Sequence, residues 1–350
     1  MSQANKYISV KLEKPEIIGD GLNAYVRYTM TTETNIPEFN ETNFKVTRRF
    51  REFHALYESL VDKYRDLGYH IPHPPEKSVT TSTKVKTTNT DLTENTEIEQ
   101  RRCALENFMG RIMREPIFVN DQLVINFLTS MLSTIKPRDN LIKLKQNISS
   151  TVFAFIPNSN EYDKWYEEKV EFIDNLEVGL QRLHYIALDL HYCRKELVFF
   201  TKKFATSLAE LRSTENEESV ANAFGSIVDL KQRAVMIYED QCINDIHELV
   251  GTTKDYLDDL ISVKHLLETY AKKFSEVKQL SGKIDKLKEK DQKISSTSSP
   301  NEVVSLSPQI DEMEKTHSYM HKNLEEFYDQ MKASVDKFEK NHIIDTRASY

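Results

Sequence analysis

The sequence predicts two domains of different class: a small α+β domain of three antiparallel strands plus helices, then an all-α domain built as a three-helix antiparallel coiled coil. Short runs of β-branched and aromatic residues before residue 50 favour strands. From residue 52 onwards, apolar residues recur at helical spacing. Glycine (8) and proline (10) are scarce among the 350 residues, which suits long helices. We expect domains at residues 1–130 and 158–350, joined by a linker at 131–157 that holds an amphipathic helix.

Charge and cysteine content exclude several function classes. The net charge is −8, so nucleic-acid binding has no support, and contact with an anionic membrane must come from local basic patches. Cys103, Cys193 and Cys242 lack the paired spacing of zinc sites and suit a reducing compartment. No apolar run has the length of a transmembrane helix, and the N-terminus lacks the apolar core of a signal peptide. We therefore expect a cytoplasmic, peripheral membrane protein without metal or cofactor.

The first domain changes from strand to helix patterning at one place. The three strands are expected at residues 7–13, 24–32 and 44–50. A helix follows from Glu52 to about residue 67, where Gly68 ends it. The proline-dense residues 71–77 predict an extended loop, and the Thr-, Ser- and Asn-rich residues after it predict a mobile one. Further helices are expected at 97–114 and 120–129.

The second half is predicted to contain three long helices. They are expected at residues 161–211, at 219–293 and from about 308 onwards, with a Ser- and Pro-rich break at 295–308. Before them, residues 139–156 form an amphipathic helix with Leu141, Leu144, Ile148 and Val152 on one face. That face either inserts into a bilayer or packs on the rod as an ordinary core stripe, and the sequence favours neither.

A basic and aromatic cluster lies where the last strand meets the first helix. It is Arg48-Arg49-Phe50, followed by Glu52-Phe53, then by the loop that ends in Lys77, and then by Arg101 on a later helix. Guanidinium groups pair with phosphates through two parallel hydrogen bonds, and an aromatic ring can form a floor for a sugar-like ring. Taken singly, each residue has an ordinary interpretation: a solvated strand end, a core phenylalanine, a loop charge. Their order over residues 5–130 resembles the phox-homology (PX) domain.

The PX resemblance implies a role for each residue of the cluster. Arg49 would bind the 3-phosphate of a phosphoinositide, and Phe50, where many members have tyrosine, would stack under the inositol ring. Lys77 would reach the phosphate next to the glycerol chain, and Arg101 would bond the ring hydroxyls. Arg102 competes with Arg101 for the last role because the two are adjacent. Arg48 is interpreted as structural or peripheral. The 3-phosphate and 3,5-bisphosphate lipids both remain open.

The helical half resembles the BAR region of the retromer-associated sorting nexins, in particular the sorting nexin 1 and 2 subgroup and its yeast counterpart. The resemblance rests on Trp165-Tyr166-Glu167-Glu168-Lys169, a motif around His191 to Leu197, and Phe338-Glu339-Lys340. It implies a homo- or heterodimer with another PX-BAR protein, whose two rods form a crescent. Lysines before the break would contact anionic lipid at the rod tip, unless they only solvate a helix end: Lys283, Lys286, Lys288 and Lys290, with Lys293 beside them.

The resemblance as a whole implies a sorting nexin that binds phosphatidylinositol 3-phosphate on endosomal membranes, dimerises, and senses or induces curvature for retrograde sorting. Retromer and cargo are its expected further partners. The alternative is an endosomal lipid-binding adaptor that does not form tubules, because the third helix, which stops at Tyr350, is short for this family. The long N-terminal extension of the subgroup is also absent from this sequence. No P-loop, GxSxG, HExxH or GxGxxG motif supports an enzyme.

Overall fold

The N-terminal head contains an antiparallel sheet in the computed structural model, which describes residues 6–19, 24–76, 96–131, 163–297 and 307–349. The central strand is β3 (Tyr25–Thr34), which pairs along one edge with β4 (Asn43–Arg49). Its other edge pairs with β1 (Ile8–Leu12) and then with β2 (Glu16–Ile18). The three expected strands are confirmed, and the short β2 is additional. Pro15 lies between β1 and β2, where its missing N–H interrupts the ladder.

Helices cover one face of the sheet and bury the core of the head. They are α1 (Phe50–Tyr64), the 3-10 turn η3 (Arg65–Leu67), α3 (Thr96–Met113), α4 (Pro116–Val119) and α5 (Gln122–Thr129). Alternate side chains of β3, such as Tyr28 and Met30, point toward the helices. They join helix residues such as Phe53 and Phe108 in one core, and all four side chains are fully buried. Gly68 ends η3 with φ +88°, as expected for a glycine that stops a helix.

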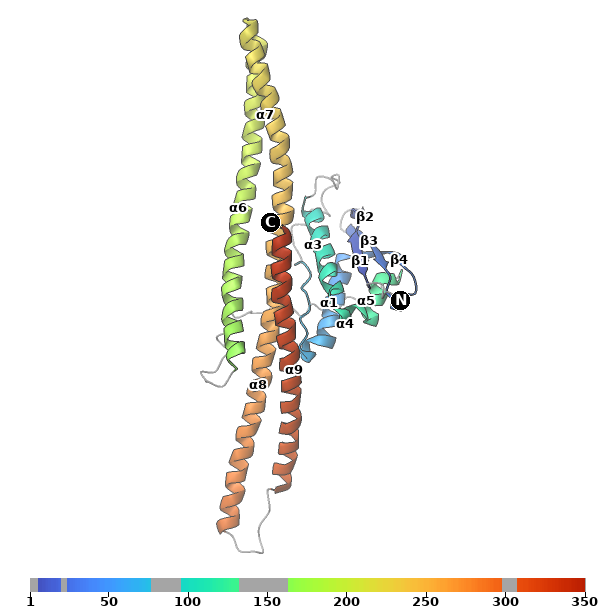
Figure 1. Ribbon diagram of the computed structural model, residues 1–350, viewed down its shortest axis with the longest axis vertical. Helices are drawn as coiled ribbons and strands as arrows, with labels where there is room; N and C mark the ends of the chain where they lie inside the picture. The colour runs from blue at the N-terminus through green and yellow to red at the C-terminus, as the bar shows by residue number, and fades with distance from the viewer. Residues whose placement is uncertain (1–5, 20–23, 77–95, 132–162, 298–306, 350) are drawn as a thin grey trace.

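The second half is a rod of long helices (Figure 1). It contains α6 (Lys164–Thr214), α7 (Glu218–Asn244), α8 (Thr252–Thr297) and α9 (Ser307–Ser349). The π-helical turn η6 (Asp245–Gly251) joins α7 to α8, so the second predicted helix is continuous apart from that turn. The α6–α7 hairpin extends to one end of the rod and the α8–α9 hairpin to the other, and they overlap in the middle.

The middle of the rod has a well-packed core. Tyr166, Val170 and Ile173 of α6 pack against Tyr256, Leu260, Val263 and Leu267 of α8 and against Phe327, Met331 and Val335 of α9. The apolar repeat expected on the second helix is therefore buried from Ile246 to Val277 at most of its positions. Within the described part of the chain, none of the helices combines the length and hydrophobicity needed to cross a bilayer.

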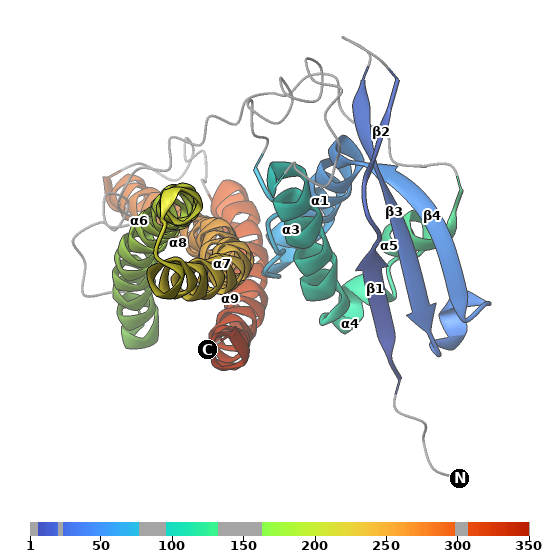
Figure 2. The ribbon, with the colours of Figure 1, turned by 90° about the horizontal axis from the view of Figure 1, so that it is seen from above.

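The head packs on the middle of the rod through its helices, not through its sheet. Figure 2 shows α1 and α3 between the sheet and the rod. At one contact, a Cβ added to Gly68 would lie 2.7 Å from the carbonyl oxygen of Phe327, and the Ser334 hydroxyl donates to the Gly68 carbonyl at 3.0 Å. The absence of a side chain at Gly68 therefore allows the head to approach the backbone of α9 closely.

Candidate functional site

The junction of β4 and α1 directs the two adjacent arginines to opposite faces of the sheet. Successive side chains of a strand alternate, so Arg48 points into the head while Arg49 points out of it. Glu52 then starts α1 by accepting a hydrogen bond from the Arg49 backbone N–H at 2.6 Å. The switch from strand to helix thereby fixes the position of Arg49 and of Phe50 beside it.

Arg48 has a structural role. Its guanidinium donates to the Phe127 carbonyl oxygen from Nε at 3.1 Å and from Nη2 at 2.6 Å, and to the Ser130 carbonyl oxygen at 2.6 Å. These carbonyls belong to the end of α5, where helices leave acceptors unsatisfied. The guanidinium also lies 5.1 Å from the centroid of the Phe127 ring. The interpretation of Arg48 as structural is therefore confirmed.

Arg49 lies on an aromatic ring and keeps its hydrogen-bond donors available. Its guanidinium carbon is 3.5 Å from the centroid of the Tyr25 ring on β3. Among the described residues, no carboxylate lies within ion-pair distance of this guanidinium. Stacking on a ring orients a guanidinium without occupying its N–H groups. The sequence analysis did not identify Tyr25, although Tyr25 is two residues before the β3 partner of Arg49 and so shares its face.

Arg101 and Phe50 form a second cation–aromatic pair nearby. The Arg101 guanidinium carbon is 4.4 Å from the centroid of the Phe50 ring, whose other neighbour is the His54 ring at 4.8 Å. Burial lowers the pKa of Arg101, and the neighbouring Tyr28 hydroxyl opposes this shift. Burial raises the pKa of Tyr28 to about 12, and Arg101 opposes that shift in turn. Arg101 is therefore held between the Phe50 ring and the Tyr28 hydroxyl, which orients its guanidinium.

The structure places Arg101, and not Arg102, at this cluster. The Arg102 guanidinium donates to the Leu12 carbonyl oxygen at 2.8 Å and pairs with Glu99 and Glu106 at 2.6 and 2.8 Å. Those bonds attach α3 to strand β1. Arg101, one residue earlier on the helix, turns toward Phe50 instead.

The segment that leads to Lys77 also reaches this cluster. The His54 Nε2 lies 3.0 Å from the Pro75 carbonyl oxygen. Lys77 itself lies outside the described residues, as do Leu141, Leu144, Ile148 and Val152 of the linker. The structure thus brings together Arg49, Phe50 and Arg101, with Tyr25 as an unexpected support. Two guanidinium groups oriented by aromatic rings are suited to bind a phosphorylated ring compound.

A second feature of functional interest is an apolar surface on the α6–α7 hairpin. Large side chains of both helices are exposed, including Tyr185 at 67%, Phe200 at 61% and Met236 at 66%. The repeat predicted on α6 is therefore largely exposed in the single chain. We call the exposed apolar residues that share one side of α6 the hairpin face; they are Phe172, Leu183, Ile186, Leu190, Leu197, Phe200, Phe204 and Leu211. The remaining exposed apolar residues of the hairpin are Val178, Tyr185, Tyr192 and Phe199, which form a second row on α6, and Val220, Ile227, Leu230, Met236, Ile237 and Ile243 of α7.

The candidate lysines of the rod tip lie near the end of α8. Lys283, Lys286, Lys288 and Lys290 are all exposed there, and Lys288 pairs with Glu314 of α9 at 2.7 Å. The α8–α9 hairpin carries them to one end of the rod, opposite the end that the α6–α7 hairpin forms (Figure 1). Within the described residues, no cluster of histidine, cysteine or acidic side chains could hold a metal ion.

Comparison with known proteins identifies two families along this chain. Residues 36–131 match the PX domain, and residues 141–350 match the family described as Vps5 C terminal like. Sorting nexin-1 of Bos taurus is 31% identical over 354 residues, with 96% of this chain and 67% of that protein covered. Sorting nexin-2 of Homo sapiens is 27% identical over 345 residues, with 97% and 66% covered.

A solved structure shares the fold. The cryo-EM structure of the SNX-BAR Mvp1 tetramer matches with a TM-score of 0.58 at 17% identity, covering 96% of this chain and 94% of that one. Such a likeness supports the arrangement of a PX head followed by a BAR-type rod, which the sequence had predicted.

Proposed function

Because the chain belongs to the PX-BAR family of sorting nexins, we propose that it binds a 3-phosphorylated phosphoinositide on endosomal membranes through the pocket at Arg49, Phe50 and Arg101. The observation that carries this proposal is the pair of guanidinium groups on aromatic rings, Arg49 on Tyr25 and Arg101 on Phe50. Arg49 and Phe50 lie where β4 passes into α1, and Arg101 reaches Phe50 from α3, where Glu97 is the carboxylate that acts on it.

Each group contributes a different interaction in the proposed complex. Arg49 donates two parallel hydrogen bonds to the 3-phosphate, since its stacking on Tyr25 leaves the N–H edge open. Phe50 supports the inositol ring, and Arg101, oriented by the Phe50 ring and the Tyr28 hydroxyl, donates to the ring hydroxyls. Lys77 supplies the charge for the phosphate next to glycerol, as the family resemblance implies.

The proposal includes a dimer formed through the hairpin face. Monomeric proteins rarely expose continuous apolar surfaces of more than a few hundred Å². The exposed α6 residues follow the spacing of a coiled-coil seam, and a second copy presents the same seam. A BAR-type rod with the fold of the Mvp1 tetramer, itself an assembly, supports this part of the proposal. Dimerisation aligns two pockets on one membrane, which raises avidity.

The membrane contacts of the rod complete the proposed role in curvature and retrograde sorting. Lys283, Lys286, Lys288 and Lys290 would approach anionic lipid at the tip, with about 1 kcal/mol for each lysine near the surface. Leu141, Leu144, Ile148 and Val152 would insert from the linker helix. We further propose retromer and cargo as partners, on the basis of family membership alone.

Sedimentation with vesicles tests the lipid pocket. The panel contains phosphatidylinositol 3-phosphate, the 3,5-bisphosphate, and the unphosphorylated lipid. Arg49→Ala is expected to lower the affinity for 3-phosphate vesicles about tenfold to hundredfold, because hydrogen bonds to charged groups contribute about 1.5–3 kcal/mol. Arg51→Ala is the matched control, since Arg51 is exposed two residues further on. Equal binding by wild type and Arg49→Ala, or an equal loss in both variants, would contradict the assignment.

A further inference from the structure

The proline-dense segment of residues 71–76, which we call the Pro segment, is held by the head on one side and by the rod on the other. We propose that Asp259 of α8, assisted by Lys254, is a positioning residue for the phosphoinositide pocket: the rod fixes the Pro segment, and with it the His54 and Phe50 rings. This inference rests on the proposed function and adds that the BAR-type rod contributes to binding of the lipid headgroup.

On the head side, the Pro segment contacts the pocket through histidine. The His54 Nε2 lies 3.0 Å from the Pro75 carbonyl oxygen, and the His54 ring packs on Phe50, the proposed floor, at 4.8 Å. The His73 ring packs edge-on against Tyr57 of α1 at 4.8 Å. A shift of the Pro segment would therefore be transmitted to the ring under the inositol.

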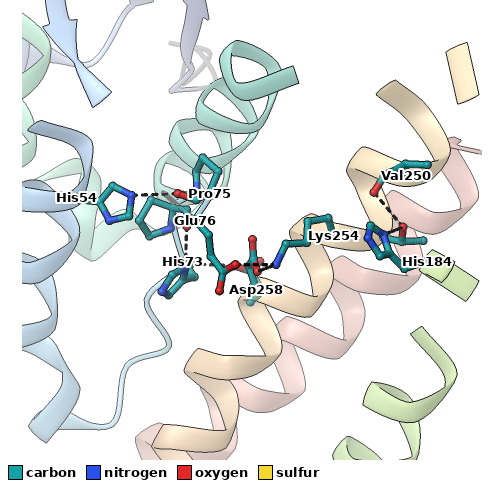
Figure 3. Close-up of polar contacts among 11 residues, drawn as sticks. His54, His73, Pro75, Glu76, His184, Val250, Lys254 and Asp258 are labelled. Atoms are coloured by element: carbon teal, nitrogen blue, oxygen red, sulfur yellow. Dashed lines mark hydrogen bonds and ion pairs between the residues drawn. The ribbon is translucent and has the colours of Figure 1, made fainter. Parts of the chain in front are cut away.

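On the rod side, two residues of α8, Asp259 and Lys254, hold the same segment. Figure 3 shows Lys254 beside Glu76 and Asp258. The His73 backbone N–H donates to Oδ1 of Asp259 at 2.9 Å, and Asp259 is almost fully buried. The Lys254 ammonium lies 3.5 Å from a carboxylate oxygen of Glu76 and 2.5 Å from one of Asp258. Glu76 immediately precedes Lys77 in the sequence. The rod thus binds the Pro segment at its middle and at the residue before the predicted phosphate ligand.

The composition of the Pro segment makes these contacts important. Residues 72, 74 and 75 are prolines and have no backbone N–H, so His73 supplies the one backbone donor of residues 72–75. Ladder or helix hydrogen bonds do not form here, and residues 71–76 have no regular secondary structure. Proline fixes φ but leaves the placement of the segment to its few hydrogen bonds. The bond from His73 to Asp259 is therefore the main backbone anchor on the rod.

A simpler interpretation is that these contacts only attach the head to the rod. Asp255 distinguishes the two, because it is a second buried aspartate on α8 that faces the head. Both carboxylates lie near Arg111 of α3, Asp259 at 3.1 Å and Asp255 at 3.6 Å. Asp255 otherwise accepts from the Asn107 side chain at 2.8 Å, and within the described residues it makes no hydrogen bond or ion pair with the Pro segment. Attachment alone predicts equal effects on lipid binding from the two positions.

Calorimetric titration of the full chain with a soluble short-chain phosphatidylinositol 3-phosphate separates these interpretations, since no membrane surface contributes. Asp259→Ala is expected to lower the affinity about tenfold, and Asp255→Ala by less than about twofold. Asp259→Asn keeps the oxygen that accepts from His73 and should stay within about threefold of wild type. Equal losses at Asp259 and Asp255, or no loss at Asp259, would overturn the inference.

A second pair of variants serves if the buried aspartate variants fail to fold. Lys254 and Lys337 are both half-exposed rod lysines that pair with head glutamates, Lys254 with Glu76 and Lys337 with Glu115 at 2.8 Å. Burial raises the pKa of Asp258 to about 7 although Lys254 lowers it, so removal of Lys254 raises this pKa further and the carboxyl takes up a proton instead of remaining as a buried unpaired charge. Lys254→Met is expected to lower the affinity about threefold and Lys337→Met to leave it unchanged. The inference fails if the two behave alike.

Arg49→Ala, included in the same titration, separates this inference from the proposed function. If Arg49→Ala binds as wild type does, the pocket assignment itself is wrong. If Arg49→Ala abolishes binding while both matched pairs show no difference, the pocket stands and only the positioning role of the rod is lost.

Discussion

The head and the rod differ in how completely they bury their apolar side chains. In the head, aromatic residues such as Phe53 and Phe108 are fully buried by neighbours from the same chain. In the rod, the middle is buried in the same manner, but Phe200 on the hairpin face is 61% exposed. The head is therefore complete as a single copy and acts through a few oriented charges. The rod leaves apolar area exposed over many residues, and that area is the basis of the proposed dimer.

The largest expected effect comes from the hairpin face. Leu197→Glu combined with Phe200→Glu should raise the dimer dissociation constant at least about hundredfold, because each buried side chain of this size contributes about 1.5–3 kcal/mol and occurs in both copies. Analytical ultracentrifugation measures this. Lys322→Glu with Asn323→Glu, at exposed positions of α9, is the control. A Leu197/Phe200 variant that remains dimeric would show that the second copy binds elsewhere; its affinity for the soluble headgroup should not change.

Arg48 and Arg49 are adjacent, but only Arg48 is expected to contribute to the stability of the head. Arg48→Met should lower the free energy of unfolding by about 3 kcal/mol, since it leaves the Phe127 and Ser130 carbonyls without their buried donor. Arg49→Met should change that free energy by less than about 0.5 kcal/mol, because its guanidinium only stacks on Tyr25. Urea denaturation measures both. Similar losses of stability in the two variants would contradict the division of roles.

Two glycines test how closely the head approaches the rod. Gly68→Ala should destabilise the protein by about 2 kcal/mol, since Gly68 has φ +88° and an added Cβ meets the Phe327 carbonyl oxygen at 2.7 Å. Gly110→Ala is the control: a Cβ there meets nothing within 4 Å, so helix propensity should stabilise α3 by up to about 1 kcal/mol. Thermal unfolding compares them, and a neutral Gly68→Ala would show that the head and α9 are not in close contact.

The smallest effect is expected from His70 at the head–rod interface. Burial lowers the pKa of His70, while Asp259 and Glu115 oppose this shift and Arg111 adds to it. The unfolded chain therefore binds more protons below about pH 6.5, so stability should fall, by about 1 kcal/mol, as the pH falls from 7.5 to 5.5.

Denaturation of wild type and His70→Gln at both pH values tests this, because the glutamine variant should lose less stability on acidification. An identical fall in both proteins would assign the pH dependence to other groups.

Much of the fold could be predicted because its signals are local. The change of apolar period after Phe50 located the junction of strand and helix, and the order of Phe50 and Arg101 indicated two side chains that the fold brings into contact. The strand β2 was missed because three residues after a proline carry too little pattern. Tyr25 was missed because its contact with Arg49 depends on strand register, which a single strand does not specify.

The head–rod interface could not be predicted from the sequence. Asp255, Asp258 and Asp259 with Lys254 have the pattern of a solvated helix face, yet all three aspartates are buried against the head. Their partners, such as Arg111 and the His73 backbone, lie more than a hundred residues away in the sequence. Burial of charge is set by tertiary contacts that composition and periodicity do not encode.

The measurement that tests the central claim most directly is the structure of the full chain with a soluble short-chain phosphatidylinositol 3-phosphate. The account predicts the 3-phosphate within hydrogen-bond distance of the Arg49 guanidinium, the inositol ring on Phe50, and ring hydroxyls at Arg101. It also predicts that His73 still donates to Asp259. A headgroup bound away from Arg49, or bound there while the Pro segment has left α8, would contradict it.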